Sequence, residues 1–286
     1  MAIIPPKVSD RLALMIKKYQ PILENAKNQD KNEADTVTVI TQILTDVFGY
    51  DQFTEITKEF AIKNTFCDLA IKVDGTIKFL IEAKAIGIKL NDNHISQATT
   101  YGAKEGIDWV VLTNGIHWII YKMNYGSKIV HKQISSFDFT ALKPKSTADH
   151  EQLFILCKEG LKKDAIEEFH AYKKIVNSFF IGSIIMGESV LETIKRELRK
   201  SSPGLKIDDK EIESILKNEV LKREIIDSEY AADAQEQYRL VLKKAKKDLA
   251  RRTQVAHNAK PEITEETATE EIAAKPSEEF TPDISD

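Results

Sequence analysis

The chain has 286 residues, 42% of them hydrophobic, and its two cysteines, Cys67 and Cys157, are too few for the disulfide framework of a small secreted domain. It contains no apolar run of about 18 residues and no secretory signal, so we expect a cytoplasmic protein that does not associate with membranes. The net charge of −4 does not exclude a nucleic-acid partner, because residues 258–286 hold nine acidic residues and two lysines and leave +3 for the rest.

The first half of the chain mixes helix and strand patterns. Apolar residues at helical spacing predict helices over 8–27 and 32–48, the second capped by Asn32. Short apolar runs predict strands over 55–62, 66–73 and 77–85, followed by a helix over 95–105. Strands 109–113 and 116–123 flank Asn114-Gly115, which suits a type I′ hairpin turn, and 129–134 adds an edge strand. We therefore predict an α/β fold, with a mixed, antiparallel-rich sheet flanked by helices.

The second half has no convincing strand pattern, and it predicts an all-α region. Helices fit residues 148–160, 162–177, 188–200, 208–226 and 229–253. We place the domains at 1–145, 146–257 and 258–286, the last being a disordered acidic tail with few large apolar residues. The helical domain is a candidate surface for a homodimer or a partner protein.

Charged residues interrupt two of the predicted strands. Glu82 and Lys84 lie in FLIEAKA, residues 79–85, and share one face of the strand with Leu80. A half-buried carboxylate is costly unless it is paired or liganded. Glu82 and Lys84 could simply pair with each other, since such triplets are common. Asp68, in the preceding strand, adds a second unexpected carboxylate, because Asp is disfavoured in strands.

The register between these strands decides whether the two carboxylates meet. A two-residue turn at Asp74-Gly75 would place Asp68 opposite Ile81, facing away from Glu82. A three-residue loop with Gly75 in the left-handed conformation would place Asp68 and Glu82 on one face. We predict that loop, or an equivalent bulge.

Two carboxylates beside a lysine suit phosphodiester hydrolysis. Carboxylate oxygens hold Mg²⁺, or Mn²⁺ as a substitute, with waters completing the coordination. The metal lowers the pKa of a bound water and offsets transition-state charge. The lysine positions that water and stabilises developing charge.

Asp68, followed by Glu82-Ala83-Lys84, resembles the D…(D/E)xK signature of the PD-(D/E)xK nuclease superfamily. Cys67 stands where the family name has proline, at a position that varies within the superfamily. Gln97 and Tyr101 resemble the QxxxY motif that follows the lysine in RecB-like and type I restriction nucleases, and i and i+4 share one helix face.

The resemblance runs from about Asn32 to Met123 and is strongest to the N-terminal nuclease domain of type I restriction enzyme R subunits and their stand-alone relatives. Glu33 resembles the acidic residue of that family's first motif, although near a helix start it could merely favour the helix dipole. The chain has no G-x-x-x-x-G-K-[ST] motif, so DNA translocation is not expected.

The resemblance implies a restriction-endonuclease-like fold and a metal-dependent deoxyribonuclease that acts in restriction or phage defence, with endonuclease as the favoured mode. Asp68, Glu82 and the Ala83 carbonyl would hold the metal, Lys84 would position the water, and Glu33, Gln97 and Tyr101 would assist. The alternative is a catalytically silent module of the same fold that binds DNA or a partner protein. The residues do not decide the target sequence, DNA against RNA, or endonucleolytic against exonucleolytic cleavage.

Overall fold

The computed structural model describes residues 2–62, 65–126 and 129–258. The side chains of residues 60–66, 96, 97, 101, 104 and 252–258 lie outside this description, as do residues 259–286. The predicted disordered tail therefore lies almost wholly outside the described residues.

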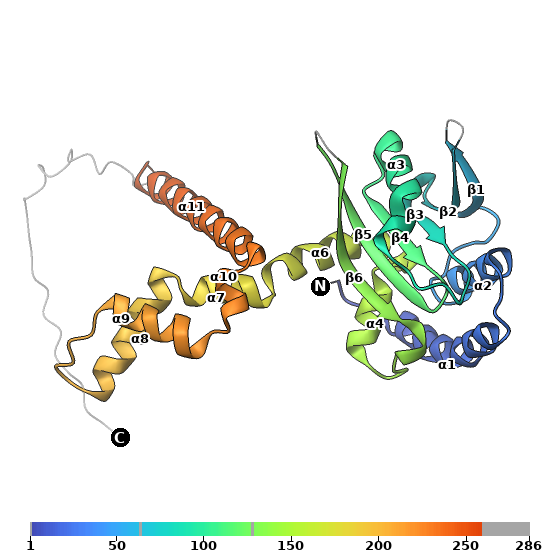
Figure 1. Cartoon of the computed structure of the whole chain (residues 1–286). Coiled ribbons are helices and arrows are strands. Elements are labelled where there is room, and N and C mark those ends of the chain that lie inside the picture. The colour runs from blue at the N-terminus through green and yellow to red at the C-terminus, as the bar shows by residue number, and fades with distance from the viewer. Residues whose placement is uncertain (1, 63–64, 127–128, 259–286) are drawn as a thin grey trace, which may run out of the picture.

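A six-stranded sheet forms the centre of the first half (Figure 1). The strands follow chain order across the sheet, and each pair is antiparallel except β3 (Thr76–Ala83) with β4 (Trp109–Thr113), which are parallel. Helix α3 (Ser96–Glu105), preceded by the short helix η1 (Asp92–Ile95), provides the crossover that a parallel pair needs. The predicted mixed, antiparallel-rich sheet is confirmed. The strands are β1 (Ile56–Ile62), β2 (Thr65–Val73), β3 (Thr76–Ala83), β4 (Trp109–Thr113), β5 (His117–Tyr125) and β6 (Ile129–Asp138).

Helices cover both faces of the sheet. Helices α1 (Pro6–Asn28) and α2 (Glu33–Asp46) lie against one face, where Leu12 and Ile40 join Ile81 in the main hydrophobic cluster. Helix α3 covers the other face, where Ala98 packs with Leu80 in a second cluster. Successive residues of β3 thus enter different clusters, as strand alternation requires.

The second half of the chain is helical, as predicted. The elements are η2 (Phe139–Ala141), α4 (Thr147–Phe154), α5 (Lys158–Leu161), α6 (Ala165–Ile175), α7 (Ser178–Ile185), α8 (Glu188–Ser201), α9 (Asp209–Ile215), η3 (Leu216–Val220), α10 (Arg223–Asp227) and α11 (Glu229–Asn258). Leu153 of α4 and Phe169 of α6 join the main cluster of the sheet, and Trp109 Nε1 donates to Glu167 Oε1 at 2.9 Å. Figure 1 shows α6 leading from the sheet toward α7–α11. The division at residues 145 and 146 stays a prediction. Within the described ranges no helix is long and apolar enough to cross a membrane.

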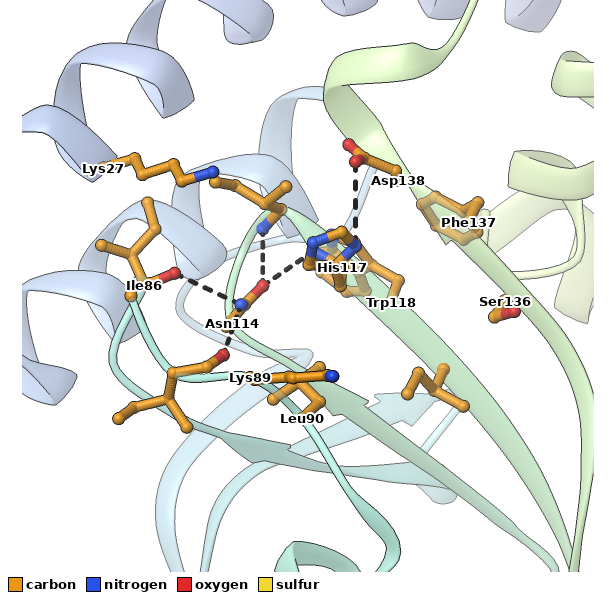
Figure 2. Close-up of a pocket in the computed structure, with 14 residues that line it drawn as sticks. Lys27, Ile86, Lys89, Leu90, Asn114, His117, Trp118, Ser136, Phe137 and Asp138 are labelled. Carbon is orange, nitrogen blue, oxygen red and sulfur yellow. Dashed lines mark hydrogen bonds and ion pairs between the residues drawn. The ribbon is translucent and has the colours of Figure 1, made fainter.

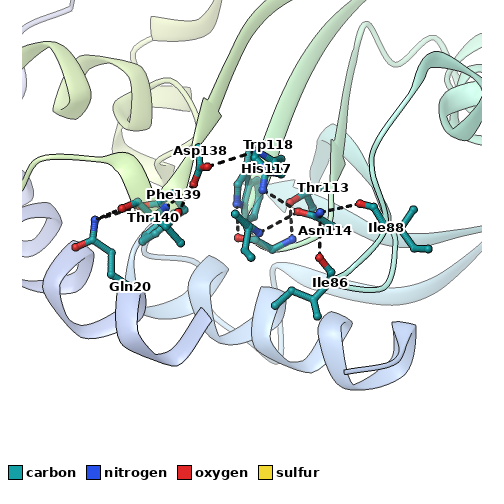
Figure 3. Close-up of polar contacts among 12 residues, drawn as sticks. Gln20, Ile86, Ile88, Thr113, Asn114, His117, Trp118, Asp138, Phe139 and Thr140 are labelled. Atoms are coloured by element: carbon teal, nitrogen blue, oxygen red, sulfur yellow. Dashed lines mark hydrogen bonds and ion pairs between the residues drawn. The ribbon is translucent and has the colours of Figure 1, made fainter. Parts of the chain in front are cut away.

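The hairpin at Asn114-Gly115 differs from the predicted type I′ turn. Thr113 pairs with Trp118, so four residues form the connection, and only Gly115 of the Asn-Gly pair has a positive φ, of 85°. The Asn114 side chain is buried and accepts a hydrogen bond from the His117 N–H at 2.7 Å (Figure 3). The prediction was wrong because Asn114 uses its side chain to shape the turn rather than a left-handed backbone.

Candidate active site

The turn between β2 and β3 is tighter than predicted. Val73 pairs with Thr76, so only Asp74 and Gly75 form the connection, and both have positive φ, of 52° and 78°. These values are typical of a type I′ turn, which Asp-Gly favours. The predicted three-residue loop is therefore wrong, and this turn alone would have turned the two carboxylates away from each other.

A β-bulge in β3 reverses that outcome. Lys72 pairs with Ile77, whereas Ile71 pairs with Phe79, so Lys78 is the additional residue. A bulge of one residue shifts the register by one and exchanges the faces of everything beyond it. The bulge that we predicted as the equivalent of the longer loop is thus confirmed.

Beyond the bulge, Leu69 pairs with Ile81, so positions 68 and 82 lie opposite each other and share one face. Asp68 Oδ2 accepts a hydrogen bond from the Ala83 N–H at 2.7 Å. The two carboxylates that the sequence placed in different strands therefore meet at the carboxyl end of β3.

Lys84 joins the two strands to helix α2. Its Nζ donates to Glu82 Oε1 at 2.6 Å and to the Ala83 carbonyl at 2.9 Å, and lies 3.8 Å from Glu33 Oε2. The Glu82 residue is 2% exposed, whereas the Glu33 side chain is 51% exposed. The structure thus brings together Asp68, Glu82, Ala83, Lys84 and Glu33.

Thr36 explains how Glu33 reaches the strand end, and the sequence reasoning missed it. Its hydroxyl donates to the Asn32 carbonyl at 2.7 Å and accepts from the Ile86 N–H at 3.1 Å. This buried side chain ties the first turn of α2 to the loop that follows Lys84. The sequence carried little signal for this role, because Thr38, Thr41 and Thr45 lie in the same predicted helix.

The charges at the site perturb one another. Burial raises the pKa of Glu82 to about 7; the hydrogen bond from Lys84 opposes this rise, and the charge on Asp68 adds to it. Burial alone would lower the pKa of Lys84, but the hydrogen bond with Glu82 and the nearby carboxylates outweigh burial and raise it. Burial is therefore the main reason that the pKa of Glu82 is raised, and the Lys84 ammonium opposes it only in part.

These donors fit a hard divalent cation. Within the described residues, Asp68 Oδ1 and Glu82 Oε2 accept no hydrogen bond, so each carboxylate keeps one oxygen available. No group of three or more His, Cys, Asp and Glu side chains suited to a metal occurs in the described part of the chain. Mg²⁺ keeps several of its waters and is usually bound by one or two carboxylates rather than by a closed all-protein cage. Two carboxylates and a backbone carbonyl are therefore a suitable set of ligands for it.

Cys67, which occupies the position before Asp68, is a packing residue. Its thiol is fully buried and donates to the Ile81 carbonyl at 3.1 Å. Burial, followed by the charge of Glu82, raises its pKa to about 12, so the thiol stays protonated and unreactive near neutral pH.

The QxxxY residues lie on α3, which packs on the face shared by Asp68 and Glu82. The side chains of Gln97 and Tyr101 are outside the described residues. Their predicted roles therefore stay predictions.

Comparison with known proteins identifies one similar family. Residues 38–137, about one third of the chain, match the family described as type I restriction enzyme R protein N terminus (HSDR_N). This confirms the resemblance predicted from the sequence, and the matched segment contains β1 to β5 and nearly all of β6. No curated protein and no solved structure matches the chain.

Proposed function

We propose that this chain, part of which is similar to the N terminus of type I restriction enzyme R proteins, is a Mg²⁺-dependent nuclease that hydrolyses DNA phosphodiester bonds. We propose further that it acts in restriction or phage defence as an endonuclease. The family match supports a restriction-related role and an interaction with DNA. The chemistry rests on the residues at the end of β3.

One observation carries the proposal. Asp68 lies in β2, Glu82 lies in β3, and Lys84 directly follows β3. The bulge at Lys78 turns these side chains toward one point. An ordinary ion pair between Glu82 and Lys84 would need neither the bulge nor Asp68. A bulge beside a functional site commonly serves to re-aim a side chain.

Each residue has a role that follows from its contacts. Asp68 and Glu82 would hold Mg²⁺ with the Ala83 carbonyl, and the bound metal would supply a water of lowered pKa and offset charge on the phosphate. The Lys84 ammonium, held charged by its carboxylate neighbours, would orient the attacking water and stabilise charge on the phosphate oxygens. Glu33 would hold Lys84 in position from the side of α2.

Cleavage of supercoiled plasmid and of linear single-stranded DNA, with Mg²⁺ or Mn²⁺, tests the proposal directly. We expect the wild type to cut and Lys84→Ala to lose cutting by at least about a hundredfold, in line with the usual contribution of a positioned charged group. Lys58→Ala is the matched control, because Lys58 is exposed on β1 and its backbone pairs with Leu69, which is not one of the proposed site residues.

A thermal shift measurement separates a nuclease from a silent module. Mg²⁺ or Mn²⁺ should raise the melting temperature of the wild type, and Asp68→Ala should abolish the rise. Binding of metal without cleavage would favour a silent DNA-binding or partner-binding module. Absence of both metal binding and cleavage would refute the proposed site.

A further inference from the structure

A cleft of about 530 Å³ lies between the loop that follows β3, the β4–β5 hairpin and β6 (Figure 2). Its lining comes from Lys27 at the end of α1, the loop 86–90, residues 114 and 116–119 of the β4–β5 hairpin, and residues 136–138 of β6. The volume is within the range of small-molecule sites. None of the roles proposed above uses this cleft.

The wall of the cleft is apolar. Ile86, Ile116, Trp118 and Phe137 line it and are themselves nearly completely buried. Trp118 is held in place because its Nε1 donates to the Gly115 carbonyl at 2.9 Å. These buried side chains form a rigid floor, and the apolar surface that is open to a flat, weakly polar ring comes from Ile88, which is 44% exposed, and from the half-buried Leu90 and Ile119.

The rim of the cleft carries an excess of positive charge. Lys27 and Lys89 lie on either side of Asn114 (Figure 2), and within the described residues neither forms an ion pair. The single acidic residue in the lining, Asp138, is already engaged: Oδ1 accepts from the Thr140 N–H and hydroxyl, and Oδ2 lies 3.8 Å from His117 Nδ1. The rim is therefore suited to an anion.

The loops that directly follow β3 and β4, the parallel pair, line part of the cleft. The Lys84 N–H donates to the Thr113 carbonyl at 2.9 Å, so the carboxyl ends of β3 and β4 adjoin. Asn114 follows directly, and its Nδ2 donates to the Ile86 and Ile88 carbonyls, at 3.3 and 2.9 Å (Figure 3). Crevices at the carboxyl ends of such strands are where open sheets bind ligands.

We infer that this cleft is a subsite for one unpaired nucleotide of the nucleic-acid strand next to the phosphate at Lys84. The base lies on the surface formed by Ile88 and Leu90, above the floor that contains Trp118, and a phosphate is held between Lys27 and Lys89. A base inside a duplex is stacked and cannot enter, so the subsite selects single-stranded or locally opened nucleic acid. This inference deepens the proposed nuclease function and rests on it for the choice of ligand.

Tryptophan fluorescence tests the subsite without requiring hydrolysis. The chain has two tryptophans, so Trp109→Phe leaves Trp118 as the reporter in the cleft floor. Deoxyadenosine 5′-monophosphate is titrated in the presence of EDTA, with deoxyadenosine and inorganic phosphate as separate probes. We expect a saturable change with the nucleotide and at least about tenfold weaker binding of either part alone.

Three variants on this background locate the binding. Lys89→Gln should weaken nucleotide binding about tenfold by removing one charged contact. Ser136 is an exposed residue in the lining of the cleft. Ser136→Phe should therefore abolish binding, because the phenyl ring fills the cleft. Lys132→Gln, exposed on β6 outside the cleft, should leave binding unchanged.

The outcomes separate this inference from the nuclease proposal. Equal binding by Ser136→Phe, or equal affinity for inorganic phosphate alone, overturns the subsite. Cleavage of DNA without nucleotide binding in the cleft leaves the nuclease in place and also overturns the subsite. Nucleotide binding that follows the three variants, without any cleavage, supports the subsite and counts against the nuclease.

Discussion

Replacing Glu82 with Gln should change how stability depends on pH. The carboxyl of Glu82 has a pKa of 4.5 as an ordinary side chain, and burial raises it to about 7 in the folded protein. The unfolded chain therefore releases this proton first as the pH rises. Folding stability falls between these two values and is constant above the higher one, so the penalty is absent at acidic pH and complete above about pH 7.

The size of the effect follows from the two pKa values. A tenfold change in a proton equilibrium corresponds to about 1.4 kcal/mol, so a rise from 4.5 to about 7 costs roughly 3 kcal/mol once the carboxyl is ionised. Gln at position 82 stays neutral, and its amide oxygen can still accept the hydrogen bond from Lys84. As the pH rises from 4.5 to 8, we expect the free energy of unfolding of Glu82→Gln to increase by roughly 3 kcal/mol relative to that of the wild type.

Urea unfolding in EDTA at several pH values measures this difference, because the chelator keeps cations from holding Glu82 ionised. Glu33→Gln is the matched control: its side chain is half exposed beside the same lysine, so the difference from wild type should stay within about 0.5 kcal/mol. A Glu82→Gln advantage that is independent of pH, or that shrinks as the pH rises, would refute the argument from burial.

Three further predictions follow from the packing. Deleting Lys78 removes the bulge, so both metal-dependent cleavage and the thermal shift with Mn²⁺ should be lost, whereas Lys78→Ala should retain them; a folded deletion variant that still responds to Mn²⁺ would contradict the register argument. Glu159 accepts two hydrogen bonds from Arg11, which lower its pKa, so this contribution is present above pH 4.5 and lost as the pH falls. Glu159→Gln should therefore lower the free energy of unfolding by under about 1 kcal/mol at pH 7 and by less at pH 3, measured by urea unfolding. A larger loss at pH 3 than at pH 7 would contradict the predicted pH dependence. A Cβ at Gly160 would clash with the Phe154 carbonyl oxygen, so Gly160→Ala should lower stability by roughly 1–3 kcal/mol, and an unchanged melting temperature would show that α5 is not packed as described.

The order and type of the elements could be predicted from the sequence because they depend on local patterns. The helix over 33–46 begins after the predicted cap Asn32, whose side chain accepts from the Asp35 N–H. Its buried residues recur at helical spacing, as in the prediction. The order of Asp68, Glu82 and Lys84 along the chain, together with Gln97 and Tyr101, likewise sufficed to find the family resemblance.

Register and long-range contacts were decided by the tertiary structure. The Asp74-Gly75 turn follows from local chemistry, but the bulge that corrects it depends on how β2 and β3 pack between two helical layers. Asn114 shows the same limit, since its buried amide bonds a loop 26 and 28 residues away. The sequence by itself determined which groups are the candidates for the chemistry; the packing of the sheet determined which way they point, because a one-residue shift in a strand reverses every side chain beyond it.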